Sequence, residues 1–308
     1  MMTEDDDDED EIVAKPGPSS AGLHTAALAA LVLVSTPIGN LQDFSNRARD
    51  TLNAVDAVLC EDTRTSAVLL RAYGIKTRMV ALHDHNESSR VPGLIAEMAQ
   101  GKRFALISDA GTPLVSDPGF RLVRAAIDAG LVVSAVPGPN AAVLALTLSG
   151  LPPHPFLFHG FLPVKAGART AEMARLRGLE AAGLRATLVF YEAPHRLAAF
   201  LADAAAGFGD RQAAVCRELS KHFEEIRRGT LPDLAAHYAA QAARGEITVV
   251  IGPAAVEVAS ADTLDAALAA ALAAMSMKDA VNAVSTATGL AKKMVYARAL
   301  TLKNDLRE

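Results

Sequence analysis

Three loops rich in glycine, proline and small polar residues are the part of this sequence best suited to bind a ligand. They read STPIGN at 35–40, SDAGTPLVSDPG at 108–119 and PGPNAA at 137–142, and each directly follows a short apolar run. Glycine lets a backbone approach a ligand closely, proline fixes a turn, and the start of a following helix supplies N–H donors. The loops hold no Lys or Arg. Their carbonyls, hydroxyls and Asp109 therefore suit adenine, ribose and an ammonium group better than a phosphate.

The same loops disfavour two common classes of nucleotide-binding protein. None of them matches G-x-x-x-x-G-K-S/T or G-x-G-x-x-G, so neither a P-loop nucleotidase nor an ordinary dinucleotide fold is expected. Any one such loop is more often a plain tight turn. Three at one edge of a sheet favour a binding site, because ligands of open α/β sheets bind at the carboxyl ends of the strands.

The segments between the loops predict the sheet that would bring them together. From residue 31 onward a short apolar run, a loop and an amphipathic segment alternate, which is typical of βα units and a largely parallel sheet. Gly74, Gly101 and Gly130 lie where helices should end. We expect strands at 31–35, 57–60, 78–82, 104–107 and 131–136.

The stretch GLPPHP at 150–155 interrupts this pattern, because its three prolines suit neither a helix interior nor a central strand. A second α/β lobe is expected after it, with helices beginning near Arg169, Pro194 and Leu231. Its strands are expected at 156–159, 187–191, 213–217, 224–228 and 247–251. The remaining sequence is alanine-rich and helical, with a break at Gly289.

The predicted fold class is therefore α/β, with two lobes and a small helical module. We expect the domains at 29–150, 151–256 and 257–308, preceded at 1–28 by an acidic tail that should be disordered. Eight acidic residues at 4–11 supply most of the net charge of −5, so the rest of the chain is mildly basic. That charge permits an anionic partner without requiring one.

Cysteine content and hydropathy indicate the compartment. Cys60 and Cys216 lie far apart, each in or beside an apolar run, so they are predicted to be buried thiols and not a disulfide or a metal pair. The apolar stretch near the start is too short to span a bilayer and lacks a basic leader. We expect a cytoplasmic protein with no membrane segment and no metal.

Eight blocks in order along the chain resemble a known family. They are LVLVSTPIGNLQDFSNRARDTL, CEDTRTS, LHDHNE, ISDAGTPLVSDPG, VPGPNAA, LVFYEAPHRL, RELSKHFEEIRRGTL and GEITVVIGP. Together they are similar to the small-subunit ribosomal RNA methyltransferase I family, a branch of the tetrapyrrole methylase-like superfamily. The resemblance implies two α/β lobes with S-adenosylmethionine (SAM) in the cleft between them. It also implies methylation of the ribose 2′-oxygen of a cytidine in the decoding region of 16S rRNA, on the small (30S) subunit, by a homodimer.

The resemblance assigns the methyl donor to particular residues. The bend at 109–116 resembles the family loop that wraps the donor, and a cationic sulfonium explains why that bend can be acidic. By position, the residues implied to contact SAM are Pro37, Asp109, Gly111, Thr112, Leu114, Val115, Ser116, Asn140, Ala141 and Tyr191. The chain departs from the family pattern in its long acidic leader and at Ser220, where Thr is common.

A ribose hydroxyl is a poor nucleophile, so a base or a polarising cation should assist the transfer. Polar residues at or after predicted strand ends are the candidates, although each alone is more simply a helix cap, a loop contact or an RNA contact. We predict Glu192 as the catalytic base, because YEAPHR pairs it with Arg196, and Lys221 as the second catalytic candidate. The other candidates are Glu61, Asp62, Arg64, His83, Asp84, Glu87 and Glu218.

Basic residues predict where RNA would bind. The segment 277–300 has the pattern of two helices and a turn found in nucleic-acid modules, although a basic residue near a helix end also complements the helix dipole. The predicted RNA-binding residues are Arg64, Arg196, Arg217, Arg227, Lys292 and Lys293, with Lys221, Arg228, Arg298 and Lys303 as further members.

Two alternatives remain open from the sequence. The same fold serves precorrin-type and diphthamide-type methylases, against which the EDTR, HDHNE and YEAPHR blocks argue. A non-catalytic SAM or nucleotide sensor tethered to RNA is a second alternative, which the polar residues crowding the cleft disfavour.

Overall fold

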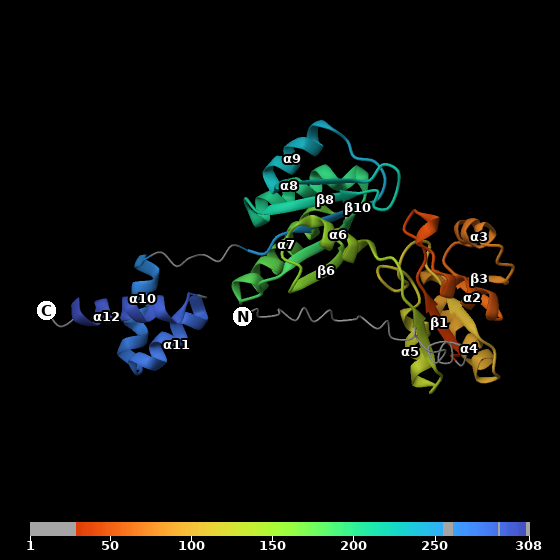
Figure 1. The fold of residues 1–308 in the computed structure, drawn as a ribbon, viewed down its shortest axis with the longest axis horizontal. Helices are drawn as coiled ribbons and strands as arrows, with labels where there is room; N and C mark the ends of the chain where they lie inside the picture. The colour runs from red at the N-terminus through yellow and green to blue at the C-terminus, as the bar shows by residue number, and fades with distance from the viewer. Residues whose placement is uncertain (1–28, 255–260, 289, 306–308) are drawn as a thin grey trace, which may run out of the picture.

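The first lobe is built on a five-stranded parallel sheet in the order β3-β2-β4-β1-β5 (Figure 1). The computed structural model describes residues 29–254, 261–288 and 290–305, so the predicted acidic tail at 1–28 lies outside the described residues. The strands are short, and the three central ones, β2, β4 and β1, are almost wholly buried, as expected for a sheet covered on both faces. They are β1 (Leu31–Val34), β2 (Ala57–Cys60), β3 (Met79–Ala81), β4 (Phe104–Leu106) and β5 (Val133–Val136).

Helices cover both faces of this sheet because alternate residues of each strand point to opposite sides. Val32 packs in one core with α2 (Asn46–Ala54) and α3 (Thr63–Ala72). Leu31 packs in the other with α4 (Asp84–Ala99) and α5 (Phe120–Asp128). Gly74, Gly101 and Gly130 follow α3, α4 and α5 at φ of 65°, 93° and 71°, which confirms the predicted helix ends.

The second sheet is mostly antiparallel, unlike the first. Its order is β6-β7-β10-β8-β9, and only β6 and β7 run parallel. Helices still connect most successive strands here, so the expected second α/β lobe is present, but its sheet is not parallel. The reason is local, since a seven-residue hairpin loop, not a helix, joins β8 to β9. The strands are β6 (Phe156–Phe161), β7 (Thr187–Glu192), β8 (Gln212–Arg217), β9 (Glu225–Thr230) and β10 (Ile247–Ile251).

One helix connects the two lobes through its packing. On one face of the second sheet lie α7 (Ala166–Ala181), α8 (Leu197–Phe208) and α9 (Leu231–Ala240). The other face is covered by α6 (Ala141–Ser149), which follows β5 of the first lobe directly. The prolines at 150–155 then join α6 to β6. Because α6 packs on the second sheet, the loop at 137–142 passes from one lobe to the other, and this predicted ligand loop lies where the two lobes meet.

The C-terminal segment forms a small module with its own core. Its helices are α10 (Ala261–Ala274), α11 (Met277–Thr288) and α12 (Lys292–Asp305), packed around Leu268, Val281, Val284, Val295 and Ala299. Figure 1 shows these helices grouped beside the second lobe, away from the first. The predicted two-helix segment at 277–300 corresponds to α11 and most of α12, while Gly289 lies outside the described residues. The predicted α/β class and the helical module are confirmed.

No helix within the described ranges is long and apolar enough to cross a bilayer.

Candidate active site

A cavity of about 410 Å³ lies between the two lobes, and all three predicted ligand loops reach it. The first lobe contributes Ile38, the bend from Asp109 to Asp117, and Asn140 and Ala141. The second lobe contributes the end of β7 and the segments around Leu219 and Glu246. This volume is in the range of pockets that hold a nucleoside-sized ligand.

Hydrogen bonds hold the three loops against one another. The backbones of Thr36 and Gly111 exchange two hydrogen bonds of 2.8 and 3.1 Å, which join the first loop to the bend. The hydroxyl of Thr112 donates to the carbonyl of Pro139 at 3.0 Å, which joins the bend to the third loop. Loops far apart in sequence therefore form one rigid wall of the cavity.

Left-handed backbone conformations gather at this wall. Gly111 has φ of 84°, and a Cβ built there would lie 3.3 Å from Cγ2 of Ile38. Among the described residues, the non-glycine residues with positive φ are Leu114, Ser116, Glu218 and Ser220. All four lie in two loops that border the cavity, the bend after β4 and the loop after β8. Residues in such conformations cluster at functional sites, because the surrounding structure must hold them there.

Acidic side chains dominate the charged lining. Asp109, Asp117, Glu192 and Glu246 line the cavity, and no Lys or Arg is among the lining residues of the described chain. Burial raises the pKa of Asp117 to about 6, and the negative charge of Glu61 adds to the effect. Burial also raises the pKa of Asp109. A cavity with this lining favours a ligand that carries positive charge.

Glu192 stands at the end of β7, and its side chain is fully buried. Its Oε1 accepts the N–H of Ala193 at 2.7 Å and lies 3.1 Å from Nε of Arg196. Its Oε2 is buried without a hydrogen-bond partner, and the residue lines the cavity. Burial raises the pKa of Glu192, an effect that the Ala193 hydrogen bond and the Arg196 charge oppose. An unpartnered buried carboxylate oxygen at a cavity is available to a ligand or to a proton.

Lys221, the second catalytic candidate, does not line the cavity. Its Nζ is 2.9 Å from Oε1 of Glu218 and 3.0 Å from Oε2 of Glu246. Burial alone would lower the pKa of Lys221, but its hydrogen bonds to both glutamates outweigh burial and leave that pKa raised. The ammonium is therefore held in an ion-paired cluster at the edge of the site.

Most of the residues assigned to SAM are brought together. Asp109, Gly111, Thr112, Val115, Ser116, Asn140, Ala141 and Tyr191 all line the cavity. Pro37 is buried beside it, and its neighbour Ile38 forms the lining instead. Leu114 turns away and packs against the core of the first lobe. Two other acid–base candidates have structural contacts, since Glu87 accepts the N–H of Leu122 and His83 caps α4.

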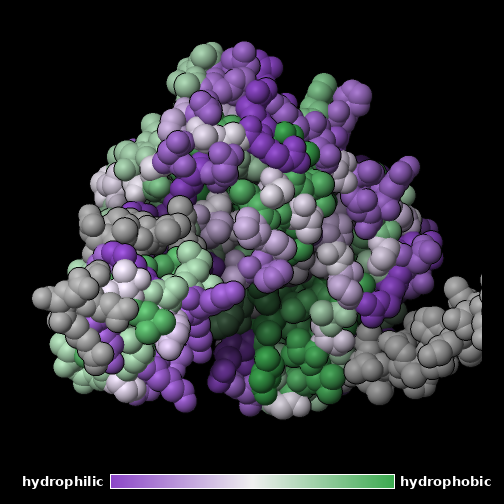
Figure 2. Space-filling model, turned by 60° about the vertical axis from the view of Figure 1, so that its left-hand side comes forward, coloured by the Kyte–Doolittle hydropathy of each residue, from purple (hydrophilic) through white to green (hydrophobic). Residues whose placement is uncertain are grey.

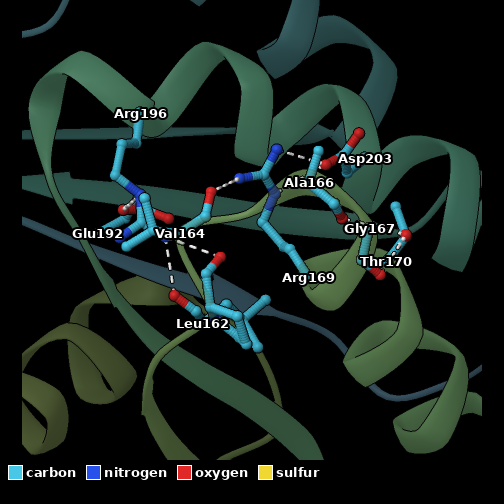
Figure 3. Close-up of polar contacts among 10 residues, drawn as sticks. Leu162, Val164, Ala166, Gly167, Arg169, Thr170, Glu192, Arg196 and Asp203 are labelled. Carbon is cyan, nitrogen blue, oxygen red and sulfur yellow. Dashed lines mark hydrogen bonds and ion pairs between the residues drawn. The ribbon is translucent and has the colours of Figure 1, made fainter.

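The predicted RNA-binding residues are spread over the surface. Arg64 is highly exposed at the start of α3, beside Asp62, whose N–H donates to Asp109 at the cavity. Arg217 and Arg227 both pair with Glu225, at 2.9 and 3.1 Å. Lys292 and Lys293 are exposed at the start of α12. Arg196 is largely buried instead, with its side chain turned inward onto Glu192 (Figure 3).

The sequence did not identify several lining residues. Asp117 belongs to the quoted bend but was not singled out, although an acid between two turn residues was a usable signal. Apart from Tyr191 and Glu192, the lining residues of the second lobe were not singled out, because the pairing of strands far apart in the chain brings them to the cavity. They include Phe161, Pro194, Cys216, Leu219, Gly245, Glu246, Ile247 and Thr248. Cys60 and Cys216 are buried free thiols, as predicted, and burial raises the pKa of Cys216 to about 12.

Two interlocked α/β lobes around a cavity define a recognisable class of protein. Residues 30–235 match the family model of the Tetrapyrrole (Corrin/Porphyrin) Methylases, so this chain belongs to the tetrapyrrole methylases. Solved structures agree on the fold. Diphthine synthase aligns with a TM-score of 0.55 and 16% identity over 72% of this chain and 90% of its own. Uroporphyrin-III-C-methyltransferase from Thermus thermophilus aligns with a TM-score of 0.50 and 23% identity over 72% and 93%.

Similarity over nearly the whole chain narrows the class further. The Ribosomal RNA small subunit methyltransferase I of Mesorhizobium japonicum is 51% identical over 89% of this chain and 92% of its own length. The protein of that name from Micromonospora olivasterospora is 45% identical over 88% and 86%. Residues 257–303 match the RsmI C-terminal HTH domain. The chain belongs to the ribosomal RNA small subunit methyltransferase I family.

Proposed function

We propose that this protein transfers a methyl group from SAM to the ribose 2′-oxygen of a cytidine in the decoding region of 16S rRNA, within the small ribosomal subunit. The observation that carries the chemistry is the buried, unpartnered Oε2 of Glu192 at the wall of an acidic cavity between the lobes. The names of relatives up to 51% identical over most of the chain support the substrate.

The lining of the cavity fits the proposed cofactor. SAM carries a positive sulfonium and an ammonium group, and Asp109, Asp117 and Glu192 supply carboxylates to a cavity that no described Lys or Arg lines. Asn140 and Ala141 place the N-terminus of α6 at the cavity, where N–H donors can meet a carboxylate. Gly111 lets the backbone of the bend approach the ligand closely. Ile38, Val115 and Tyr191 provide apolar surface for an adenine ring.

The protein contributes orientation and a proton acceptor. When bound, SAM supplies a methyl group on a positively charged sulfur. The two lobes hold the ribose hydroxyl in line with that group, and such positioning provides much of the rate in a displacement. Glu192 accepts the hydroxyl proton at Oε2, since Oε1 is already engaged by Ala193 and Arg196. Burial raises the pKa of Glu192, which makes the carboxylate a stronger base than an exposed glutamate.

We further propose that the helical module docks the RNA. The matched domain is named as a helix-turn-helix, and Lys292 and Lys293 lie exposed at the start of α12. Arg64 is ion-paired with Asp62, whose N–H donates to Asp109 at the cavity, so Arg64 would contact the same RNA close to the reacting ribose. Phosphate contacts of this kind position the protein on its substrate. We also propose a cytoplasmic location, because the proposed substrate is the ribosomal subunit.

A homodimer is the assembly we propose, through an apolar face of the first lobe. On α5, Phe120 and Ile127 are 70% and 55% exposed, and Val132 is exposed just before the edge strand β5. Figure 2 shows hydrophobic residues gathered in one continuous area at the lower centre of the view. Such areas mark protein interaction sites. Sedimentation of a Phe120→Glu variant would give a monomer if this face pairs two copies, and an unchanged dimer if it does not.

The decisive experiment maps ribose methylation in a strain that lacks the gene. One decoding-region cytidine should lose its 2′-O-methyl group, and a plasmid copy should restore it whereas a Glu192→Gln copy should not. An unchanged map in the deletion strain would refute the proposed substrate. Parallel assays on tetrapyrroles and on elongation factor would detect the two alternative methylases. SAM binding without any transfer would identify a sensor.

A further inference from the structure

The connection from β6 to α7 is held by two arginines from different elements, the buried Arg169 and the largely buried Arg196 (Figure 3). Nη2 of Arg196 donates to the carbonyls of Leu162 and Pro163, at 2.8 and 3.3 Å. Nη1 of Arg169, on α7, donates to the carbonyl of Val164 at 3.3 Å. Three consecutive carbonyls of one loop are therefore fixed by two guanidinium groups.

The two arginines differ in the acid that neutralises them. Arg169 is 5% exposed and pairs with Asp203 of α8, at 2.7 Å from Nε and 2.6 Å from Nη2. Arg196 pairs instead with Glu192, at 3.1 Å. A buried charge is costly unless it is paired, so removal of either partner leaves the other unfavourably charged. Arg169 anchors the loop to the body of the lobe, whereas Arg196 anchors it to a residue of the cavity.

The loop that Arg196 holds continues directly into the cavity wall. Phe161 precedes Leu162, lines the cavity, and lies with its ring centroid 5.6 Å from that of Tyr191. Leu162 is 2% exposed and packs in the core of the second lobe. A contact at Leu162 and Pro163 therefore sets where Phe161 stands relative to Glu192.

We infer that Arg196 is a positioning residue and not an RNA contact: its guanidinium joins the Glu192 carboxylate to the carbonyls of Leu162 and Pro163, and thereby aims the unpartnered Oε2 of Glu192 at the cavity beside Phe161. The two oxygens of Glu192 have different roles as a result. Oε1 is occupied by Ala193 and Arg196, which leaves Oε2 for the substrate. This inference rests on the proposed function where it takes methyl transfer as a readout.

The charges around Glu192 determine what loss of Arg196 would do. Arg196 and His195 face it from η2 (Pro194–Arg196), and Arg169 faces it from α7. Asp109, Asp117 and Glu246 line the same cavity. Burial raises the pKa of Glu192 and Arg196 opposes that rise. Without Arg196 the pKa of Glu192 must rise further, so at any given pH a larger fraction of the carboxylate is protonated.

The first test is the pH profile of methyl transfer to 30S subunits by Arg196→Met. The acid limb of this profile should move up by one pH unit or more, and activity should partly recover at high pH. The SAM affinity, measured by calorimetry, should stay within about threefold of that of the unchanged protein. Arg196→Lys, which keeps the charge, should move the limb less than half as far. Arg185→Met is the matched control, because Arg185 is an exposed arginine just before β7, the strand that ends at Glu192. The pH profile of this variant should match that of the unchanged protein.

The second test does not depend on catalysis. The folded-state pKa of Glu192 lies above its unfolded value, so ionisation of Glu192 opposes folding and stability falls as pH rises through that interval. Arg196→Met raises the folded-state pKa further, so it should enlarge this fall in melting temperature and extend it to higher pH. In a Glu192→Gln background, Arg196→Met should leave the pH dependence of the melting temperature unchanged.

The outcomes separate the two proposals. If Arg196→Met weakens binding to 30S subunits but leaves both the pH profile and the stability profile unchanged, Arg196 is a phosphate ligand and the inference fails. If the stability profile shifts while the limb of the rate profile stays in place, the positioning contact stands and Glu192 is not the proton acceptor, which overturns the proposed mechanism alone.

Discussion

The side chain of Lys221, from the second lobe, lies directly over Gly39 of the first. A Cβ built on Gly39 would come within 2.4 Å of Cγ and Cε of Lys221, and Gly39 has φ of 143°. The hydroxyl of Ser220 also donates to Asp43, next to the same loop. The loop after β8 thus closes onto the first lobe at the cavity edge, where Leu219 and Glu246 form part of the lining.

Gly39→Ala should therefore separate the lobes at this point. The new methyl group must displace the Lys221 stem and its ion pairs with Glu218 and Glu246. Gly183→Ala is the control, because Gly183 also has a strongly positive φ, of 110°, but has no atom within 4 Å of the added Cβ. We expect Gly39→Ala to lower the free energy of unfolding in urea by about 1–2 kcal/mol more than the control does, and to weaken SAM binding. Equal losses in the two variants would show that only backbone strain matters.

The first lobe was predictable because its sequence signals are local. Apolar runs of strand length predicted all five strands to within two residues at each end. Glycines marked the helix ends, and the loops at one sheet edge predicted the ligand site. The second sheet was not predictable as a topology. The placement of β10 between β7 and β8 depends on pairing between segments far apart in the chain, and nothing local encodes that order.

The same limit applies to the roles of charged side chains. Arg196, Lys221 and Glu87 are charged residues after strands or at helix starts, so their types suggested chemistry or RNA contact. Their partners come from other elements: Leu162 for Arg196, Glu246 for Lys221 and Leu122 for Glu87. The sequence alone does not show whether a charged residue faces solvent or forms an ion pair with a residue from another element. Only the tertiary structure distinguishes the two.

Gly111→Val should weaken SAM binding by at least tenfold, or about 1.4 kcal/mol, while the fold survives. A branched side chain at φ of 84° is strained, and its Cβ would press on Ile38 and approach the carbonyl of Pro139. Gly130→Val has the same left-handed conformation in open space and serves as the control. Calorimetry of both variants makes the comparison. SAM affinity near that of the unchanged protein would show that the bend is structural only.

The affinity for SAM should rise between pH 5 and 7. Burial raises the pKa of Asp117 to about 6, so its carboxyl is mostly neutral at pH 5 and mostly charged at pH 7. The charged form attracts a cation, and its lining position places it at the cavity. S-adenosylhomocysteine, which lacks the sulfonium charge, should show a weaker dependence on pH. Asp117→Asn should flatten the SAM curve, and a curve that keeps its shape in this variant would assign the titration to another group.

The last prediction concerns docking of the RNA by the helical module. Lys292 and Lys293 are exposed at the start of α12, whereas Arg298 in the same helix is ion-paired with Asp265 of α10. If the two lysines contact phosphates, they displace counterions, and the logarithm of affinity must fall with the logarithm of salt concentration. Changing both to Gln should make that slope shallower by up to about two units. The helix should persist, because Gln has nearly the helix propensity of Lys.

A matched control removes the same charge elsewhere. Lys102 and Arg124 are exposed on the first lobe, and their change to Gln lowers the net charge by the same amount without touching the module. We expect this control to keep the salt slope of the unchanged protein. Both double variants should keep its SAM affinity, because the residues lining the cavity all precede residue 249. Binding to 30S subunits over a series of salt concentrations measures the slopes. An unchanged slope and full activity in Lys292→Gln/Lys293→Gln would show that these lysines are only the solvated face of a structural helix.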